Sequence, residues 1–147
     1  MNKKVFRKIE EEFNVCPEAF GGPVPLEEIA QAEEILQVRL PEDYRFFLLK
    51  YGSGAIGEAI ILGLKEAEFV ATPSFVKQSL HFRDILPEGY KKFIAIGVDG
   101  AGNPVGFNSP DPEIIAFDFD FGGKEVIAAS FEAYVEKALR NELNIYF

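Results

Sequence analysis

The chain has 147 residues, and 48% of them are hydrophobic, which is enough for one compact domain with its own core. It carries 15 basic and 24 acidic side chains, and the resulting charge of −9 argues against nucleic acids and anionic membranes as partners. No apolar run approaches the roughly 18 residues of a membrane span, and no long apolar stretch follows the first basic residues as it would in a secretory signal. The single cysteine, Cys16, excludes an internal disulfide framework, so we expect a cytoplasmic protein.

The first 23 residues are predicted to form an accessory segment. Apolar side chains at helical spacing predict an amphipathic helix over residues 3–13. Residues 14–23 are rich in proline and glycine, which is typical of a linker. We therefore divide the chain into an accessory helix and linker, residues 1–23, and one domain, residues 24–147.

Two helices are predicted at the centre of this domain. Acidic residues in the first turn and a shared apolar face predict the first helix over residues 25–36. Pro41 suits the first turn of the second helix, because an N–H at that position would have no partner, and Gly52 suits the cap after its last turn. The faces expected to pack together consist of Ile29, Ala32 and Leu36 in the first helix and Tyr44, Phe47, Leu48 and Tyr51 in the second.

Turns and short apolar runs follow these helices. Residues 52–57 are predicted to form a turn, and residues 59–62 a strand. Thr72 is the expected N-cap of a further helix, which has Pro73 at its first position and ends at about Arg83. Two hairpins are then predicted, formed by residues 93–98 with 104–107 and by residues 114–121 with 125–128.

A closing helix is predicted after Ser130, which is the expected N-cap. Its buried face consists of Phe131, Tyr134, Val135, Ala138 and Leu139. Helices first, antiparallel strands in the middle and a final helix are typical of an α+β domain. We expect a single α+β domain with a mostly antiparallel sheet flanked by helices.

Two glycine-rich stretches resemble ligand loops. Residues 52–57 fit the spacing of the dinucleotide fingerprint, but that motif needs a strand before it and a helix after it, and the order here is reversed. Residues 99–103 resemble the start of a calcium loop, but they lack the alternating oxygen ligands and the closing glutamate. We interpret the first stretch as a helix-ending turn and the second as a hairpin turn.

The remaining candidates for catalysis are also incomplete. Asp118 and Asp120 alternate with three phenylalanines, so we expect both carboxylates on one face of a strand, about 7 Å apart. That spacing would suit acid–base chemistry, but nothing nearby in the sequence indicates a substrate cleft, and we favour a solvated strand face. His81 and Cys16 lack the partners of a triad or a metal site. The residues favour binding over catalysis, with no enzyme activity and no cofactor.

The excess of acidic residues is concentrated in one segment. Residues 99–125 contain six acidic side chains and one lysine, and so they carry −5 of the total charge of −9. Such a segment serves either solubility or a basic partner.

Two regions of the chain carry a motif. The first contains seven residues, which we call the signature residues and for which we expect structural roles: Glu33, Pro41, Asp43, Tyr44, Tyr51, Gly52 and Gly63. The second region covers residues 96–103. Together they resemble the SUKH superfamily, whose namesakes include the yeast cell-wall assembly regulator, and the resemblance covers about residues 24–140.

The resemblance implies a protein-binding fold. Bacterial members typically act as immunity proteins that bind toxin domains, often nucleases, and eukaryotic relatives serve as regulatory interaction domains. We therefore expect an immunity-type protein that neutralises a basic toxin domain by stoichiometric binding, and the alternative is a regulatory scaffold without a toxin. The candidate partner-binding residues are Asp111, Glu113, Asp118 and Asp120.

Overall fold

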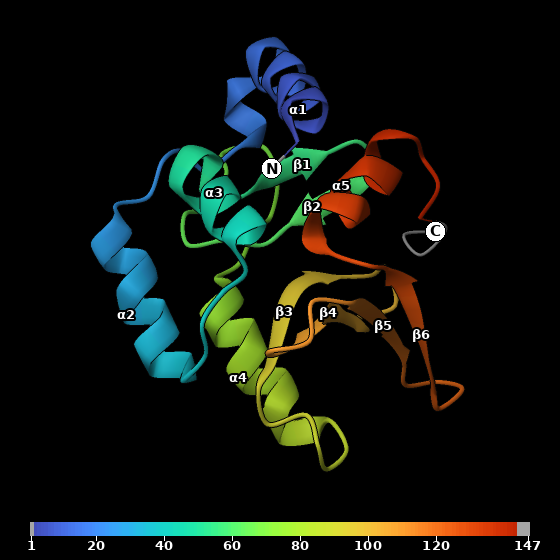
Figure 1. The fold of residues 1–147 in the computed structure, drawn as a ribbon. Coiled ribbons are helices and arrows are strands. Elements are labelled where there is room, and N and C mark those ends of the chain that lie inside the picture. The colour runs from blue at the N-terminus through green and yellow to red at the C-terminus, as the bar shows by residue number, and fades with distance from the viewer. Residues whose placement is uncertain (1, 144–147) are drawn as a thin grey trace.

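A computed structural model describes residues 2–143, which fold into helices around two antiparallel sheets (Figure 1). The helices are α1 (Lys3–Val15), the short 3-10 helix η1 (Pro17–Ala19), α2 (Leu26–Leu36), α3 (Glu42–Tyr51), α4 (Phe75–Ile85) and α5 (Phe131–Leu139). The strands are β1 (Gly54–Ile56), β2 (Ala59–Ile61), β3 (Phe93–Val98), β4 (Pro104–Asn108), β5 (Ile114–Asp118) and β6 (Gly123–Ala128). The predicted α+β class and the antiparallel pairing are confirmed.

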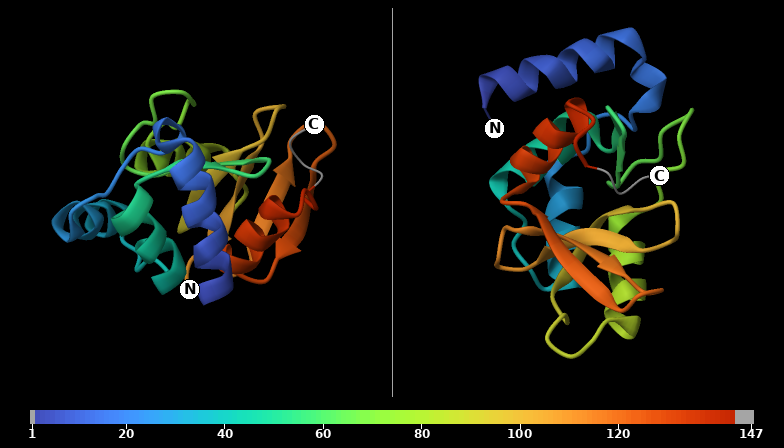
Figure 2. Two further views of the ribbon diagram at one scale, coloured as in Figure 1. Left: turned by 90° about the horizontal axis from the view of Figure 1, so that it is seen from above. Right: turned by 90° about the vertical axis from the view of Figure 1, so that its right-hand side faces the viewer.

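The larger sheet contains β3 to β6, and each strand lies beside the next one in the chain. Successive residues of β3 belong to two different hydrophobic clusters, because successive side chains point to opposite faces of a sheet. Phe93 packs with Phe82 of α4, whereas Ile94 joins the main core between the sheet, α3 and α5. Figure 2 shows α4 behind the sheet when it is viewed from the side of β6. The smaller β1–β2 sheet is joined to β3 through the Leu62 N–H, which donates to the Ile96 carbonyl over 2.8 Å.

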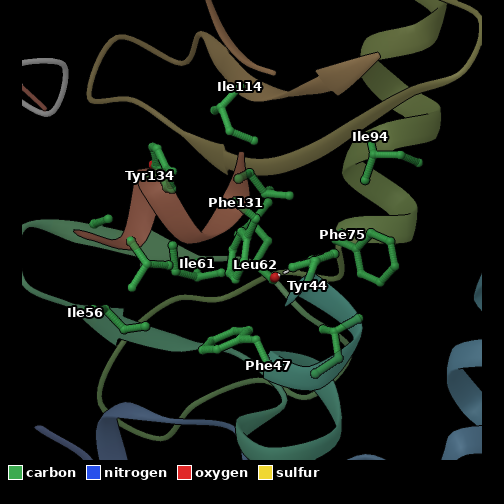
Figure 3. Close-up of a cluster of buried hydrophobic side chains, with 14 of the residues drawn as sticks. Tyr44, Phe47, Ile56, Ile61, Leu62, Phe75, Ile94, Ile114, Phe131 and Tyr134 are labelled. Carbon is green, nitrogen blue, oxygen red and sulfur yellow. Dashed lines mark hydrogen bonds between the residues drawn. The ribbon is translucent and has the colours of Figure 1, made fainter. Parts of the chain in front are cut away.

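The two central helices pack together as predicted. Every residue of the two expected apolar faces is at most 2% exposed and belongs to the main core cluster, of which Figure 3 shows Tyr44 and Phe47. Pro41 is the N-cap of α3, and the acidic Glu42 and Asp43 occupy its first turn, where the helix dipole favours negative charge. Gly52 is the C-cap of α3, as predicted, and its φ of 75° is a positive value that glycine adopts without strain.

Helix α1 packs on this core with an apolar face and two polar contacts. Val5 and Ile9 are buried in the main cluster. The Glu12 carboxylate accepts a hydrogen bond from the Gly57 N–H over 3.0 Å, and Glu10 accepts one from the Tyr51 hydroxyl over 2.6 Å. The division of the chain at residue 23 stays a prediction.

Three local predictions were wrong. Residues 54–56, expected in a turn, form strand β1, because they pair with residues 59–61. The N-cap of α4 is Ser74 rather than Thr72, whose buried hydroxyl instead accepts the Ala67 N–H over 2.7 Å. The strand expected over residues 114–121 ends at Asp118, where a turn begins.

Candidate partner-binding surface

The signature acids use their oxygens inside the fold. Glu33 of α2 accepts the Leu40 N–H over 2.8 Å and lies 3.8 Å from the Arg45 guanidinium, which fixes the short link into α3. Asp43 accepts its neighbour's N–H with one oxygen and the N–H of Glu132 with the other, over 3.0 Å. Because Glu132 lies in the first turn of α5, Asp43 joins α3 to the start of the last helix.

The signature tyrosines are anchored in the same way. The Tyr44 hydroxyl donates to the Leu62 carbonyl over 2.6 Å in the buried core, as the dashed line in Figure 3 shows. Burial raises the pKa of Tyr44 well above its ordinary value. The pKa of Tyr51 is also raised, first by burial and then by its hydrogen bond to the Glu10 carboxylate. Both phenols therefore act as neutral hydrogen-bond donors within the fold.

The two signature glycines permit a close approach between chain segments. A Cβ on Gly63 would lie 1.5 Å from the Gly52 carbonyl oxygen, and a Cβ on Gly52 would lie 2.0 Å from the Gly22 carbonyl oxygen. No larger residue fits at either position without moving the backbone. In this structure the seven signature residues therefore hold helices, loops and strands together, and a surface for a partner has to be sought elsewhere.

Two turns of the acidic segment, residues 99–125, lie at one end of the larger sheet. In the β3–β4 turn, Asp99 accepts the N–H groups of Ala101 and Asn103, each over 2.9 Å. This confirms the hairpin turn predicted for residues 99–103. The Asn103 side-chain oxygen accepts the Phe119 N–H over 2.9 Å, and so it joins the first turn to the second.

The second turn corrects the expected placement of Asp118 and Asp120. Asp118 ends β5 and accepts the N–H groups of Asp120 and Phe121 over 3.1 and 3.2 Å, which is a local turn interaction. Asp120 lies in the turn, so the two carboxylates do not project from one strand face. Phe117 is buried as expected, but Phe119 is 43% exposed and Phe121 is 90% exposed. The alternation fails because the chain leaves the strand after Asp118.

The two turns and the adjoining strands line an open depression with a volume of about 460 Å³. Four acidic residues line it, Asp99, Asp118, Asp120 and Glu125, and Lys124 is the one basic residue of the lining. Among residues 2–143, the carboxylates of Asp120 and Glu125 form no ion pair and accept no hydrogen bond. Lys124 points to Tyr90, which it contacts at the hydroxyl and, 5.1 Å from the ring centre, through a cation–π interaction. Two of the four carboxylates that line the depression, those of Asp120 and Glu125, are therefore neither paired with a cation nor hydrogen-bonded within residues 2–143.

The structure separates the four candidate partner-binding residues into two groups. Asp118 and Asp120 lie at the depression, whereas Asp111 and Glu113 lie in the exposed loop between β4 and β5. That loop is at the other end of these strands, and a five-residue strand is about 17 Å long. The charged surface at the depression consists of Asp118 and Asp120 together with Asp99 and Glu125.

Exposed apolar side chains on the turn and strand next to the depression were not predicted as part of the site. Phe119, Phe121 and Val126 are exposed by 43%, 90% and 53%, and they lie on the β5–β6 turn and on β6. A turn at residues 119–122 would have exposed the two phenylalanines, and Gly122–Gly123 is the sequence signal for such a turn. Aromatic side chains are enriched at protein–protein interfaces, so acidic and apolar groups together suit a protein partner.

The described residues offer no complete alternative site. No group of three or more His, Cys, Asp and Glu side chains within residues 2–143 is arranged to hold a metal ion. His81 is exposed and packs edge-on against Phe82, with ring centres 5.0 Å apart. No helix in residues 2–143 is both long and apolar enough to cross a membrane.

The sequence pattern of the SMI1 / KNR4 family (SUKH-1) matches residues 23–137. The chain belongs to this family. The match contains α2 to β6 and most of α5, so the SUKH-1 region includes the acidic depression and leaves α1 outside. This match confirms the resemblance to the SUKH superfamily that the sequence motifs indicated. A comparison with curated proteins found no match.

Proposed function

We propose that this SUKH-1 protein is an immunity-type binding protein that neutralises a basic toxin domain, such as a nuclease, by stoichiometric binding. The observation that carries the proposal is the depression lined by four carboxylates and one lysine, beside exposed aromatic side chains. A nuclease active site has to be basic to hold phosphate groups. An acidic protein surface is attracted to such a site and blocks it without any catalytic residue or cofactor of its own.

The partner-binding residues in this proposal are Asp118, Asp120 and Glu125, while Asp111 and Glu113 form a separate candidate surface. Asp120 and Glu125 are exposed and accept no hydrogen bond from residues 2–143. Replacing both by lysine therefore changes the charge and leaves internal contacts intact. Asp118 requires a milder change, because its oxygen accepts two backbone N–H groups, and Asp118→Asn retains an acceptor while it removes the charge.

The test is co-expression with a small basic toxin domain, chosen from reading frames next to this chain's gene, followed by association rates at two ionic strengths. We expect Asp120→Lys with Glu125→Lys to slow association by at least about tenfold at low salt, because electrostatic steering raises association rates by about 10 to 1,000-fold. The difference should shrink near 1 M salt, where the screening length falls to about 3 Å. Thermal stability should change by less than about 0.5 kcal/mol per site.

The matched control is Glu66→Lys with Glu68→Lys, which makes the same change in charge on an exposed loop. A second arm, Asp111→Asn with Glu113→Lys, tests the other end of the sheet. Full protection of cells and unchanged association with the Asp120 and Glu125 variant at low salt would refute the proposal. A partner that binds but does not inhibit growth when expressed alone would favour the regulatory scaffold instead.

A further inference from the structure

Strand β6 is an edge of the larger sheet. Among residues 2–143 it pairs only with β5, so one side of its backbone has no strand beside it. Residues 123–126 of this strand are exposed. Figure 2 (right) looks onto this side of the molecule, with β6 in front of the other strands. A strand edge of this kind presents N–H and C=O groups that can pair with another chain.

The two faces of the sheet differ in character along β6. Val126 pairs with Ile115, and Phe117 pairs with Lys124, so these side chains share the face toward α4, where Phe117 also packs. Glu125 pairs with Ala116, and Gly123 pairs with Asp118, so the opposite face carries the acidic depression. A strand added to β6 would therefore place alternate side chains over an apolar face and over an acidic face.

Lys124, the one basic residue of β6, does not block pairing along this edge. Lysines on edge strands commonly prevent pairing with other chains. Here the Lys124 amine points onto the Tyr90 ring on the face of the sheet, 5.1 Å from the ring centre. The Tyr90 ring in turn packs edge-on against Phe117, with centres 5.2 Å apart. The positive charge is thus held over one face and away from the free backbone groups.

We infer that β6 binds its protein partner by strand addition, and that the added segment is extended, with basic and apolar side chains in alternation. Backbone hydrogen bonds to β6 would supply attraction that does not depend on sequence. Basic side chains would lie over Glu125 and Asp118, and apolar side chains would lie beside Val126. The inference rests on the proposed function only for the identity of the partner.

The test uses synthetic peptides and does not need the toxin. One short capped peptide has lysine and valine in strict alternation, and the control has the same composition with all lysines before all valines. We expect the alternating peptide to cause saturable NMR shifts at the amides of residues 123–126 and to slow their hydrogen exchange. The control should bind at least about tenfold more weakly, a difference of about 1.4 kcal/mol.

Variants on the exposed apolar side chains separate strand addition from simple charge attraction. Val126→Lys should weaken the alternating peptide by about tenfold or more, because it removes the apolar contact and adds a like charge. Ile35→Lys is the matched control, since Ile35 on α2 is 58% exposed and Val126 is 53% exposed. Circular dichroism melts verify that both variants fold.

Three results would overturn the inference. They are equal binding of the two peptides, absence of binding by both, and amide shifts that avoid β6. Equal binding with shifts around Asp120 would leave the acidic surface of the proposed function in place, with charge attraction as its only mechanism. Failure of the toxin experiment with success of the peptides would instead leave β6 as a docking strand for another partner.

Discussion

Replacing Phe47 by alanine tests whether the packing of α3 holds the fold together. Phe47 is fully buried, and its ring lies 5.6 Å from that of Phe131 on α5 and 5.7 Å from that of Tyr51. The change leaves a cavity between α3 and α5, and truncations of buried phenylalanine cost about 3 to 5 kcal/mol. For a chain of this size each kcal/mol lowers the melting temperature by about 2 to 4 °C, so a fall of at least about 6 °C is expected.

The adjacent residue provides a matched control on the same helix. Phe46 is 37% exposed and contacts Phe6 of α1 edge-on, with ring centres 5.5 Å apart. Phe46→Ala makes the same chemical change and should cost less than about 2 kcal/mol, since an aromatic pair contributes about 0.5 to 1.5 kcal/mol beyond area burial. Urea denaturation of both variants gives the two free energies of unfolding. A loss below about 1 kcal/mol for Phe47→Ala, or a loss no larger than that of the control, would show that this face of α3 is not core.

Three further predictions concern the signature residues. Gly52→Ala should destabilise by more than about 1 kcal/mol in urea melts, because φ is positive and the added Cβ would lie 2.0 Å from a carbonyl oxygen. Asp43→Ala should cost about 1 to 2 kcal/mol, because the start of α5 loses an acceptor, and hydrogen exchange there should accelerate. Tyr44 and Tyr51 have raised pKa values in the fold, so stability should be full below about pH 10, where the unfolded phenols ionise, and fall as the pH rises above it. Melts at about pH 8 and about pH 11 should show this loss, and Tyr51→Phe should reduce it.

The central helices could be predicted from sequence because their signals are local. In α3, the proline at the start, the acidic first turn, the apolar stripe and the final glycine all lie within residues 41–52. The closing helix is a second case, since the Ser130 hydroxyl accepts the Ala133 N–H as an N-cap should. The hairpins were located by their turns for the same reason.

Elements that depend on distant partners could not be predicted in this way. Residues 54–56 form a strand because β2 and Phe20 lie beside them, and nothing in the three residues themselves indicates it. Thr72 is a good N-cap by sequence, but its hydroxyl accepts the Ala67 N–H and lies 3.2 Å from the Ser53 hydroxyl. The charge of the proposed partner surface is visible in the sequence, whereas the separation of the two acidic pairs follows from the sheet topology.

The structure divides the acidic residues into two classes that experiments can distinguish. Glu33 and Asp43 accept backbone N–H groups between elements, so their loss should lower stability, and binding should fall only as far as folding fails. Asp120 and Glu125 accept no hydrogen bond within residues 2–143. Their replacement should therefore leave the stability of the fold unchanged and slow association with the proposed basic partner directly. Asp118 lies between the two classes, because it holds a turn and also lines the depression. Asp118→Asn should therefore retain the fold and lose association rate, whereas Asp118→Ala should lose both.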